Sequence, residues 1–170
     1  YLYEVLNNIP ETTDETLVSF GGYIPSSDIL QELEEEWEEF GIHYYHVGFI
    51  IIDLNTGMGL SYDLDRQYYS ASSIKGPYAL SFADLNPDSA TNFEGTIESM
   101  LVYSDNDAYT TLQNIYHREY IMQWCEECGA DPEVNRYKYP HISTRDMTRL
   151  WVHGYDYINS TELGAVIGSY

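Results

Sequence analysis

The stretch Tyr69-Ser70-Ala71-Ser72-Ser73-Ile74-Lys75-Gly76-Pro77 holds one of only two lysines in the chain. Lys75 follows Ser72 by three residues, and residues i and i+3 lie on one face of a helix. If a helix begins near Ser72, the Lys75 amine lies beside the Ser72 hydroxyl. An amine whose pKa is lowered by desolvation can take the proton of a serine and activate it as a nucleophile. Taken alone, the spacing is better explained by an unrelated serine and lysine on one helix face.

A second polar motif, Ser104-Asp105-Asn106, follows an apolar run at residues 100–102. We expect it at a junction between two helices, where a hydroxyl and an amide can point into a cleft. Ser104 could then relay a proton, and Asn106 could hold both a substrate carbonyl and Lys75. The alternative is an ordinary helix cap, since Ser, Asp and Asn all favour helix starts. Both motifs in this order, each at a helix start, favour the catalytic interpretation.

N-terminal to these motifs, the apolar pattern predicts one helix and one hairpin. Apolar residues at helical spacing among glutamates predict an amphipathic helix over residues 27–40. Strand-forming residues predict a hairpin of residues 44–53 and 58–63, joined by Asn55-Thr56-Gly57. Residues 1–26 show no clear period, and we interpret them as an irregular N-terminal extension.

C-terminal to Ser72, the pattern is mostly helical. A loop at residues 86–89 precedes a helix around 97–102, and one longer helix is predicted from about 107 to 129. A loop over 129–142 leads to Ser143-Thr144-Arg145-Asp146, which has the form of a capping box and opens another helix. This order predicts an α+β fold of the α/β sandwich type. At two strands its antiparallel sheet looks incomplete.

The composition disfavours several classes of partner. The 170 residues carry 28 Asp and Glu against 7 Lys and Arg, a formal net charge of −21. This charge disfavours nucleic acid and anionic membrane surfaces, because both are bound by clustered Lys and Arg. No apolar run approaches the roughly 18 residues of a membrane span. With 44% apolar residues, the chain can form one domain around its own core.

The cysteines and histidines do not indicate a metal site. Cys125 and Cys128 lie at a predicted helix end, beside glutamates that raise the thiol pKa and oppose redox reactivity. We interpret them as a structural pair or a local disulfide. His43 and His46 are close in sequence, but in a strand they would point to opposite faces. We predict no metal and no cofactor.

Together, Ser72-x-x-Lys75 and Ser104-Asp105-Asn106 resemble the S-x-x-K and S-D-N motifs of the serine β-lactamase and penicillin-binding protein superfamily, in a class A-like form. The segment 143–151 is similar to the helix start after the active-site loop of class A enzymes. The resemblance covers about residues 27–165. It implies a β-lactamase/transpeptidase-like fold with a helical lobe, and a partial serine hydrolase domain over 27–170.

The resemblance also implies roles for individual residues. Ser72 would be the acylated nucleophile, and Lys75 its base or proton acceptor. Ser104 would pass a proton to the leaving nitrogen, and Asn106 would contact the substrate. The backbone N–H of Ser72 would form part of the oxyanion hole.

Three features depart from the family pattern. No Lys-[Ser/Thr]-Gly occurs, so we expect that a C-terminal segment needed to complete the fold is missing and that this piece alone is inactive or severely impaired. Only 32 residues (104 − 72) separate the two motif serines, which implies a shortened helical lobe. The loop of the deacylating glutamate is either represented by residues 131–135, with Asp131 or Glu133 as base, or deleted. We favour deletion, because the segment directly follows the helix-ending Gly129.

These features predict an acyl-serine hydrolase or transferase of the penicillin-recognising type, acting on a β-lactam or a D-alanyl peptidoglycan-like peptide. The alternative is a non-catalytic relative that acts as a cell-surface binding or interaction module, for which the 18 tyrosines are suited. The chain begins at Tyr1 without Met or a signal-peptide pattern. We therefore expect a trimmed product, secreted or at a bacterial cell surface.

Overall fold

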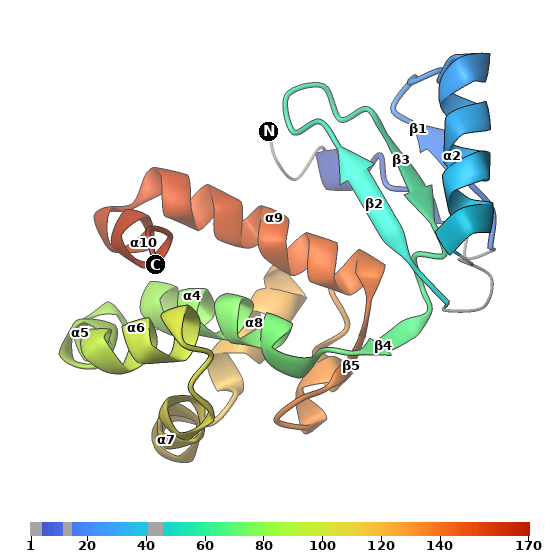
Figure 1. Cartoon of the computed structure of the whole chain (residues 1–170). Coiled ribbons are helices and arrows are strands. Elements are labelled where there is room, and N and C mark those ends of the chain that lie inside the picture. Colours follow the sequence, from blue (N-terminus) through green and yellow to red (C-terminus); the bar gives the residue numbers. More distant parts are fainter. Residues whose placement is uncertain (1–4, 12–14, 41–45) are drawn as a thin grey trace. The chain divides into compact units, whose positions relative to one another are not determined.

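The computed structural model of the chain describes residues 5–11, 15–40 and 46–170. The chain divides into two compact units, one of Tyr1–Arg66 with Ser143–Arg145 and the other of Gln67–Ile142 with Asp146–Tyr170. Helices and small sheets occur together (Figure 1), so the prediction of an α+β fold is confirmed at this coarse level. Within the described residues, no helix is long and apolar enough to cross a bilayer.

The first unit contains a three-stranded antiparallel sheet in the order β1-β3-β2. Its strands are β1 (Val18–Phe20), β2 (Phe49–Ile52) and β3 (Gly59–Tyr62). The acidic helix α2 (Ser27–Phe40) lies beside this sheet (Figure 1). The Trp37 ring of α2 packs on the rings of Phe49 and Tyr62, at centroid distances of 5.8 and 5.0 Å. The predicted helix over 27–40 thus forms with the predicted bounds, and its glutamates are exposed to solvent.

Two predictions about this part of the chain are wrong. Residues 1–26 are not wholly irregular, because β1 pairs Val18 with Ser61 and Phe20 with Gly59. The sheet therefore has three strands and not two. A strand of three residues is too short to show a period in the sequence. His43 and the start of the predicted strand 44–53 lie outside the described residues.

The second unit is mostly helical and holds the larger core. Its helices are η1 (Ala71–Ile74), α4 (Lys75–Leu85), α5 (Pro87–Asn92), α6 (Glu94–Val102), α7 (Asn106–Tyr116), α8 (Glu119–Cys128), η2 (Pro132–Arg136), α9 (Thr144–Ser160) and α10 (Glu162–Ile167). A two-stranded sheet joins β4 (Gln67–Tyr69) to β5 (His141–Ser143).

Helix α4 lies at the centre of this unit and fixes the position of the Ser72 region. It contacts α5, α6, α8 and α10, and its Tyr78 and Phe82 are fully buried. Gly76 lets the Trp151 ring of α9 lie against the start of α4, since a Cβ at Gly76 would come within 2.5 Å of that ring. The first turn of α4 is therefore packed closely against α9.

Three predictions about the second unit need correction. The single helix predicted from 107 to 129 is two helices, because His117 ends α7 with a backbone φ of 55°. The predicted loop at 86–89 is already helical from Pro87, which is well suited to a first helical turn. The predicted loop 129–142 contains the short helix η2 and the start of β5. Apolar spacing continued across the break at His117, and so it could not reveal the break.

Candidate active site

The four polar side chains predicted from the two motifs lie together in the second unit. The Ser104 Oγ donates to the Ser72 Oγ at 2.8 Å. The Lys75 Nζ donates to the Ser104 Oγ at 3.2 Å, to the Ser104 carbonyl oxygen at 2.6 Å and to the Asn106 Oδ1 at 2.8 Å. Ser72, Ser104, Lys75 and Asn106 thus form one continuous hydrogen-bonded array.

Ser104 occupies the central position in this array, which the S-x-x-K spacing did not predict. From that spacing we expected the Lys75 amine directly beside the Ser72 hydroxyl. The hydrogen bonds of the described residues instead run from Lys75 to Ser104 and from Ser104 to Ser72. A proton can therefore move between Ser72 and Lys75 through the Ser104 hydroxyl.

Two residues at the array have left-handed backbone conformations. Ala71, directly before Ser72, has a φ of 46°, and Ser104 has a φ of 53°. Such conformations are costly for residues other than glycine, and they concentrate at functional sites where the surrounding structure enforces them. At Ser104, this conformation lies between the end of α6 at Val102 and the start of α7 at Asn106.

Asp105 is the helix cap in the Ser104-Asp105-Asn106 motif. Its side chain accepts from the backbone N–H groups of Asp107 at 2.8 Å and Ala108 at 3.1 Å, at the start of α7. The Ser99 hydroxyl also donates to this carboxylate at 2.9 Å. The cap interpretation therefore applies to Asp105, while Ser104 and Asn106 contact Lys75 instead of capping the helix.

Ser72 is distinguished from the serines on either side of it. The Ser73 hydroxyl donates to the Ser70 carbonyl oxygen at 2.6 Å, and Ser70 itself is buried. Ser72 is exposed, and its hydroxyl contacts Ser104. As a residue in the first turn of η1, Ser72 has a backbone N–H without an intrahelical acceptor.

Lys75 is buried, with only 2% of its surface exposed. Burial lowers the pKa of its amine, because desolvation penalises the charged form. The nearby Asp105 carboxylate acts in the opposite direction, and Lys138 adds to the lowering. A lowered pKa raises the neutral fraction of the amine, which is the form that can accept a proton from a hydroxyl.

Two residues that sequence reasoning missed also lie at this site. The Tyr139 hydroxyl donates to the Asn106 Oδ1 at 2.7 Å. The Lys138 Nζ donates to the Asn106 carbonyl oxygen at 3.5 Å and also to the Thr110 hydroxyl. Both residues come from the segment before β5, which the sequence presented only as a loop. The single available signal was that Lys138 is the second of the chain's two lysines.

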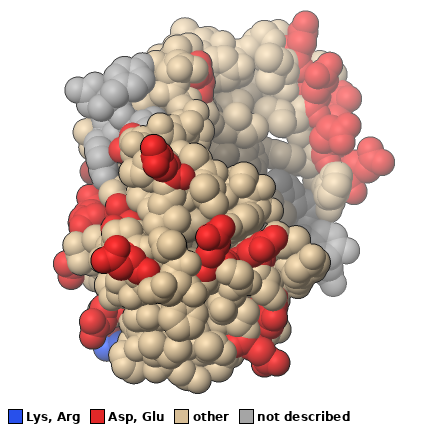
Figure 2. Space-filling view, turned by 90° about the vertical axis from the view of Figure 1, so that its left-hand side faces the viewer, with Lys and Arg blue, Asp and Glu red and all other residues tan. Residues whose placement is uncertain are grey.

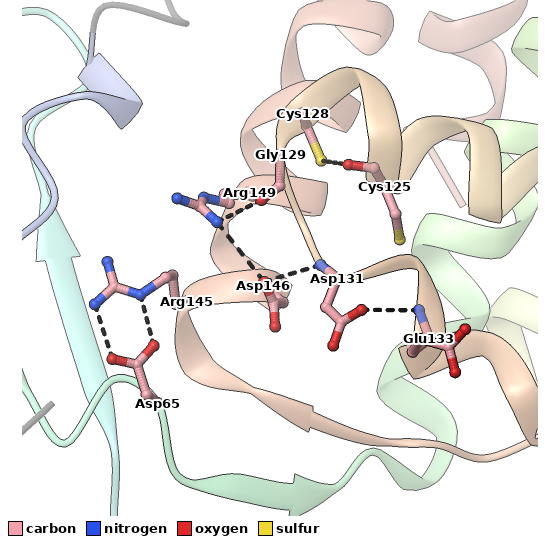
Figure 3. A network of polar contacts seen from close by, with 9 residues as sticks. All are labelled: Asp65, Cys125, Cys128, Gly129, Asp131, Glu133, Arg145, Asp146 and Arg149. Atoms are coloured by element: carbon pink, nitrogen blue, oxygen red, sulfur yellow. Dashed lines mark hydrogen bonds and ion pairs between the residues drawn. The ribbon is translucent and has the colours of Figure 1, made fainter. Parts of the chain in front are cut away.

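The structure gives the two carboxylates considered as deacylating bases other partners, and Figure 3 shows those of Asp131. The Asp131 side chain caps η2 by accepting from the Glu133 N–H at 2.9 Å, and the Asp131 N–H donates to Asp146 at 3.3 Å. Glu133 forms an ion pair with Arg136 at 2.7 Å. Among the described residues, no hydrogen bond joins Asp131 or Glu133 to Ser72.

Residues of the motif at 143–151 have structural contacts. Arg145 forms a bidentate pair with Asp65 in the first unit, with N–O distances of 2.6 and 3.0 Å (Figure 3). Arg149, in the second unit, donates to the Gly129 carbonyl oxygen at the end of α8. Gly129 has a φ of 75°, the left-handed conformation that commonly ends a helix.

The two cysteines are buried thiols and not a disulfide. The Cys128 thiol donates to the Cys125 carbonyl oxygen at 3.8 Å (Figure 3), and burial raises its pKa. Both observations fit the structural interpretation and not a reactive thiolate. Within the described residues, no group of three or more His, Cys, Asp and Glu side chains is placed to hold a metal ion.

The protein surface is strongly acidic. On the face drawn in Figure 2, Asp and Glu side chains far outnumber Lys and Arg. Against this background, the two lysines at Asn106 form a local concentration of positive charge. At a similarity that would indicate a relationship, no protein family, curated protein or solved structure matches the chain.

Proposed function

We propose that this chain is an acyl-serine enzyme of the penicillin-recognising type, in which Ser72 is acylated by a β-lactam or a D-alanyl peptidoglycan-like peptide. The observation that carries the proposal is the array in which Ser104 bridges the Ser72 hydroxyl and the buried Lys75 amine. The resemblance of the two motifs to the serine β-lactamase and penicillin-binding protein superfamily supports it. A left-handed backbone at Ala71 and at Ser104 adds support, since such strain persists where function requires it.

In the acylation step, the Ser72 Oγ forms a bond to the carbonyl carbon of the acyl donor. Its proton passes through the Ser104 hydroxyl to the neutral Lys75 amine. The developing oxyanion is stabilised by the Ser72 N–H at the helix start. When the C–N bond breaks, the proton returns from Lys75 through Ser104 to the leaving nitrogen. Over the whole step, Ser72 loses one proton, the leaving nitrogen gains one, and Ser104 and Lys75 return to their starting states.

Asn106 positions both the base and the acyl donor. Its Oδ1 accepts from Lys75 at 2.8 Å and from Tyr139 at 2.7 Å. With the oxygen occupied by two donors, the amide N–H groups remain for a carbonyl of the acyl donor. This arrangement supports the substrate contact that the resemblance implies for Asn106.

Deacylation is expected to be slow. Hydrolysis of an acyl-serine requires a base that holds a water molecule within about 3 Å of the ester. Asp131 and Glu133, the two candidates for this base, instead cap η2 and pair with Arg136. The acyl-enzyme should therefore persist, which is penicillin-binding rather than β-lactamase behaviour.

The second candidate function is a non-catalytic surface-binding module. Its support is a set of exposed tyrosines, among them Tyr103 at 78%, Tyr137 at 70% and Tyr69 at 59% exposure. Exposed tyrosines suit protein and carbohydrate contacts. This candidate makes no use of the hydrogen bonds among Ser72, Ser104 and Lys75, and we therefore rank it second.

Labelling with a fluorescent penicillin separates the two functions. The wild-type chain should become covalently labelled during prolonged exposure, and Ser72→Ala should not. Ser73→Ala is the matched control, since its hydroxyl only contacts the Ser70 carbonyl oxygen, and it should be labelled like the wild type. Absence of label in the folded wild-type chain, or equal labelling of Ser72→Ala, would leave the binding module as the better account.

A further inference from the structure

Both lysines of this chain contact the same residue. The Lys75 Nζ donates to the side-chain oxygen of Asn106, and the Lys138 Nζ donates to its main-chain oxygen. No lysine lies elsewhere in the 170 residues. In a chain with a net charge of −21, both lysine side chains thus meet at one asparagine, and a positive charge there favours an anionic group of a ligand.

Lys138 is held in place without a carboxylate. Its Nζ donates to the Thr110 hydroxyl and lies 5.4 Å from the ring centroids of both Tyr109 and Tyr139. The Tyr109 hydroxyl also donates to the Lys138 carbonyl oxygen at 2.9 Å. Among the residues that the structure describes, every ion pair involves an arginine or a histidine, and none involves Lys138. Its charge is fixed in position but not neutralised.

Lys138 lies close to the residue that would contact the acyl donor. The Asn106 side-chain amide, which would contact the carbonyl of the acyl donor, belongs to a residue whose main-chain oxygen lies 3.5 Å from the Lys138 Nζ. A group attached near that carbonyl therefore comes within reach of the ammonium. The Tyr139 ring, whose hydroxyl contacts Asn106, packs against the Tyr69 ring at a centroid distance of 6.3 Å, and the two rings offer an aromatic surface.

We propose that Lys138 is an anion subsite that selects acyl donors carrying a carboxylate on the acyl side chain, next to an aromatic or apolar group. The proposal rests on the proposed function, because it names the substrate class of the same site. Lys138 would pair with that carboxylate through its remaining N–H donor. Tyr139 would pack against the adjacent apolar group and keep Asn106 oriented.

The test compares two penicillins that differ only at this point. Carboxybenzylpenicillin carries a carboxylate on the carbon that links its phenyl ring to the side-chain amide, and benzylpenicillin does not. The ratio of their second-order acylation rate constants measures recognition of the carboxylate. In Lys138→Met this ratio should fall about tenfold, as expected for loss of one charge-assisted hydrogen bond. Lys138→Arg should keep most of the preference.

The ratio separates recognition from indirect effects. Removing Lys138 raises the pKa of Lys75, because Lys138 lowers it. This change slows acylation by both penicillins equally and leaves the ratio unchanged. Arg136→Met is the matched control, since it removes one positive charge from the same segment, where Arg136 pairs with Glu133. Its ratio should equal that of the wild type.

If the two acylation rate constants fall by the same factor in Lys138→Met, or do not fall at all, their ratio is unchanged. An unchanged ratio would overturn the subsite and leave Lys138 with a structural role.

If neither penicillin acylates the wild type, the proposed function fails, and binding still tests the subsite. In Ser72→Ala labelled with ¹³C-lysine, two lysine signals are expected, and Lys138→Met assigns them. Carboxybenzylpenicillin should shift the Lys138 signal more than benzylpenicillin does, and equal or absent shifts would overturn the proposal.

Discussion

Two polar clusters of the second unit use similar residue types in opposite ways. In the array of Ser72, Ser104, Lys75 and Asn106, a serine hydroxyl and an amide remain exposed while the amine that contacts them is buried. In the turn around η2, Asp131 and Glu133 are exposed, but each carboxylate already has a partner within its own segment. Figure 3 shows the contact of the Asp131 carboxylate with the Glu133 N–H. The first cluster includes a strained left-handed backbone at Ser104, whereas the second is an ordinary capped helix.

This difference teaches that the partner of a functional group matters more than its residue type. A carboxylate that caps its own turn is not positioned to hold a water molecule at a distant ester. The buried Lys75 amine donates to a hydroxyl, a carbonyl and an amide oxygen. None of these partners is a carboxylate, so no direct ion pair keeps the amine protonated. The first cluster should therefore perform acylation, and the second should not contribute to deacylation.

The largest expected effect comes from removing the base in the first cluster. Lys75→Met should reduce the acylation rate constant by about 10²–10⁴, the usual contribution of a general base. The fold should persist, because methionine fills the buried space without a charge. The growth of the adduct over time, followed by intact mass spectrometry, and a thermal unfolding curve measure the two properties. Acylation at the wild-type rate would show that Lys75 is not the base.

Replacing Ser104 tests the relay and the strain at once. Ser104→Ala and Ser104→Gly should each slow acylation by about 10²-fold, because both lack the bridging hydroxyl. The glycine variant should be the more stable of the two by about 0.5–1 kcal/mol, since glycine adopts a φ of 53° without steric cost. Denaturant unfolding measures this difference. An alanine variant that acylates normally would remove Ser104 from the mechanism.

The pH dependence of acylation should report the lowered pKa of Lys75. Only the neutral amine accepts a proton, so below its pKa the rate should rise about tenfold per pH unit and then level off. Since burial lowers that pKa, the plateau should begin at a lower pH than an exposed lysine would give. Rate constants measured across the alkaline range test this. A rate that is independent of pH would contradict the assignment of Lys75 as base.

The smallest effects are expected in the second cluster. Asp131→Asn and Glu133→Gln remove one carboxylate each, and the lifetime of the acyl-enzyme should stay within about twofold of the wild type. Asp131→Ala should lower the free energy of unfolding by about 1 kcal/mol through loss of the cap, while Asp131→Asn preserves it. Adduct decay followed by mass spectrometry gives the lifetimes. A much longer lifetime in Asp131→Asn or Glu133→Gln would identify that residue as the deacylating base.

The sequence predicted which residues form the first cluster but not which of them are hydrogen-bonded to each other. Ser72, Lys75, Ser104 and Asn106 could be selected because motif spacing and helix starts are local properties. The bridging role of Ser104 could not, since it depends on how the α6–α7 junction meets the start of α4. Lys138 and Tyr139 were missed for the same reason, because their contacts with α7 are made across 28 to 33 residues of chain.

The fold shows the same limit. Helix α2 formed as predicted because its apolar spacing is regular over the whole span of 14 residues. Strand β1 was missed because three residues carry no period and its stability comes from pairing with β3, about 40 residues away (61 − 18 = 43). The break at His117 was missed because it is a change of backbone conformation between two helices of matching apolar pattern.

The central claim, that Ser72 is the acylated nucleophile, is tested most directly by locating the modified residue. The wild-type chain is incubated with benzylpenicillin, its intact mass is followed over time, and the adduct is mapped by peptide mass spectrometry. We predict one added penicillin per chain, attached to Ser72, that persists for long after the free penicillin is removed. An adduct on another residue, or a folded chain that gains no mass, would contradict the account.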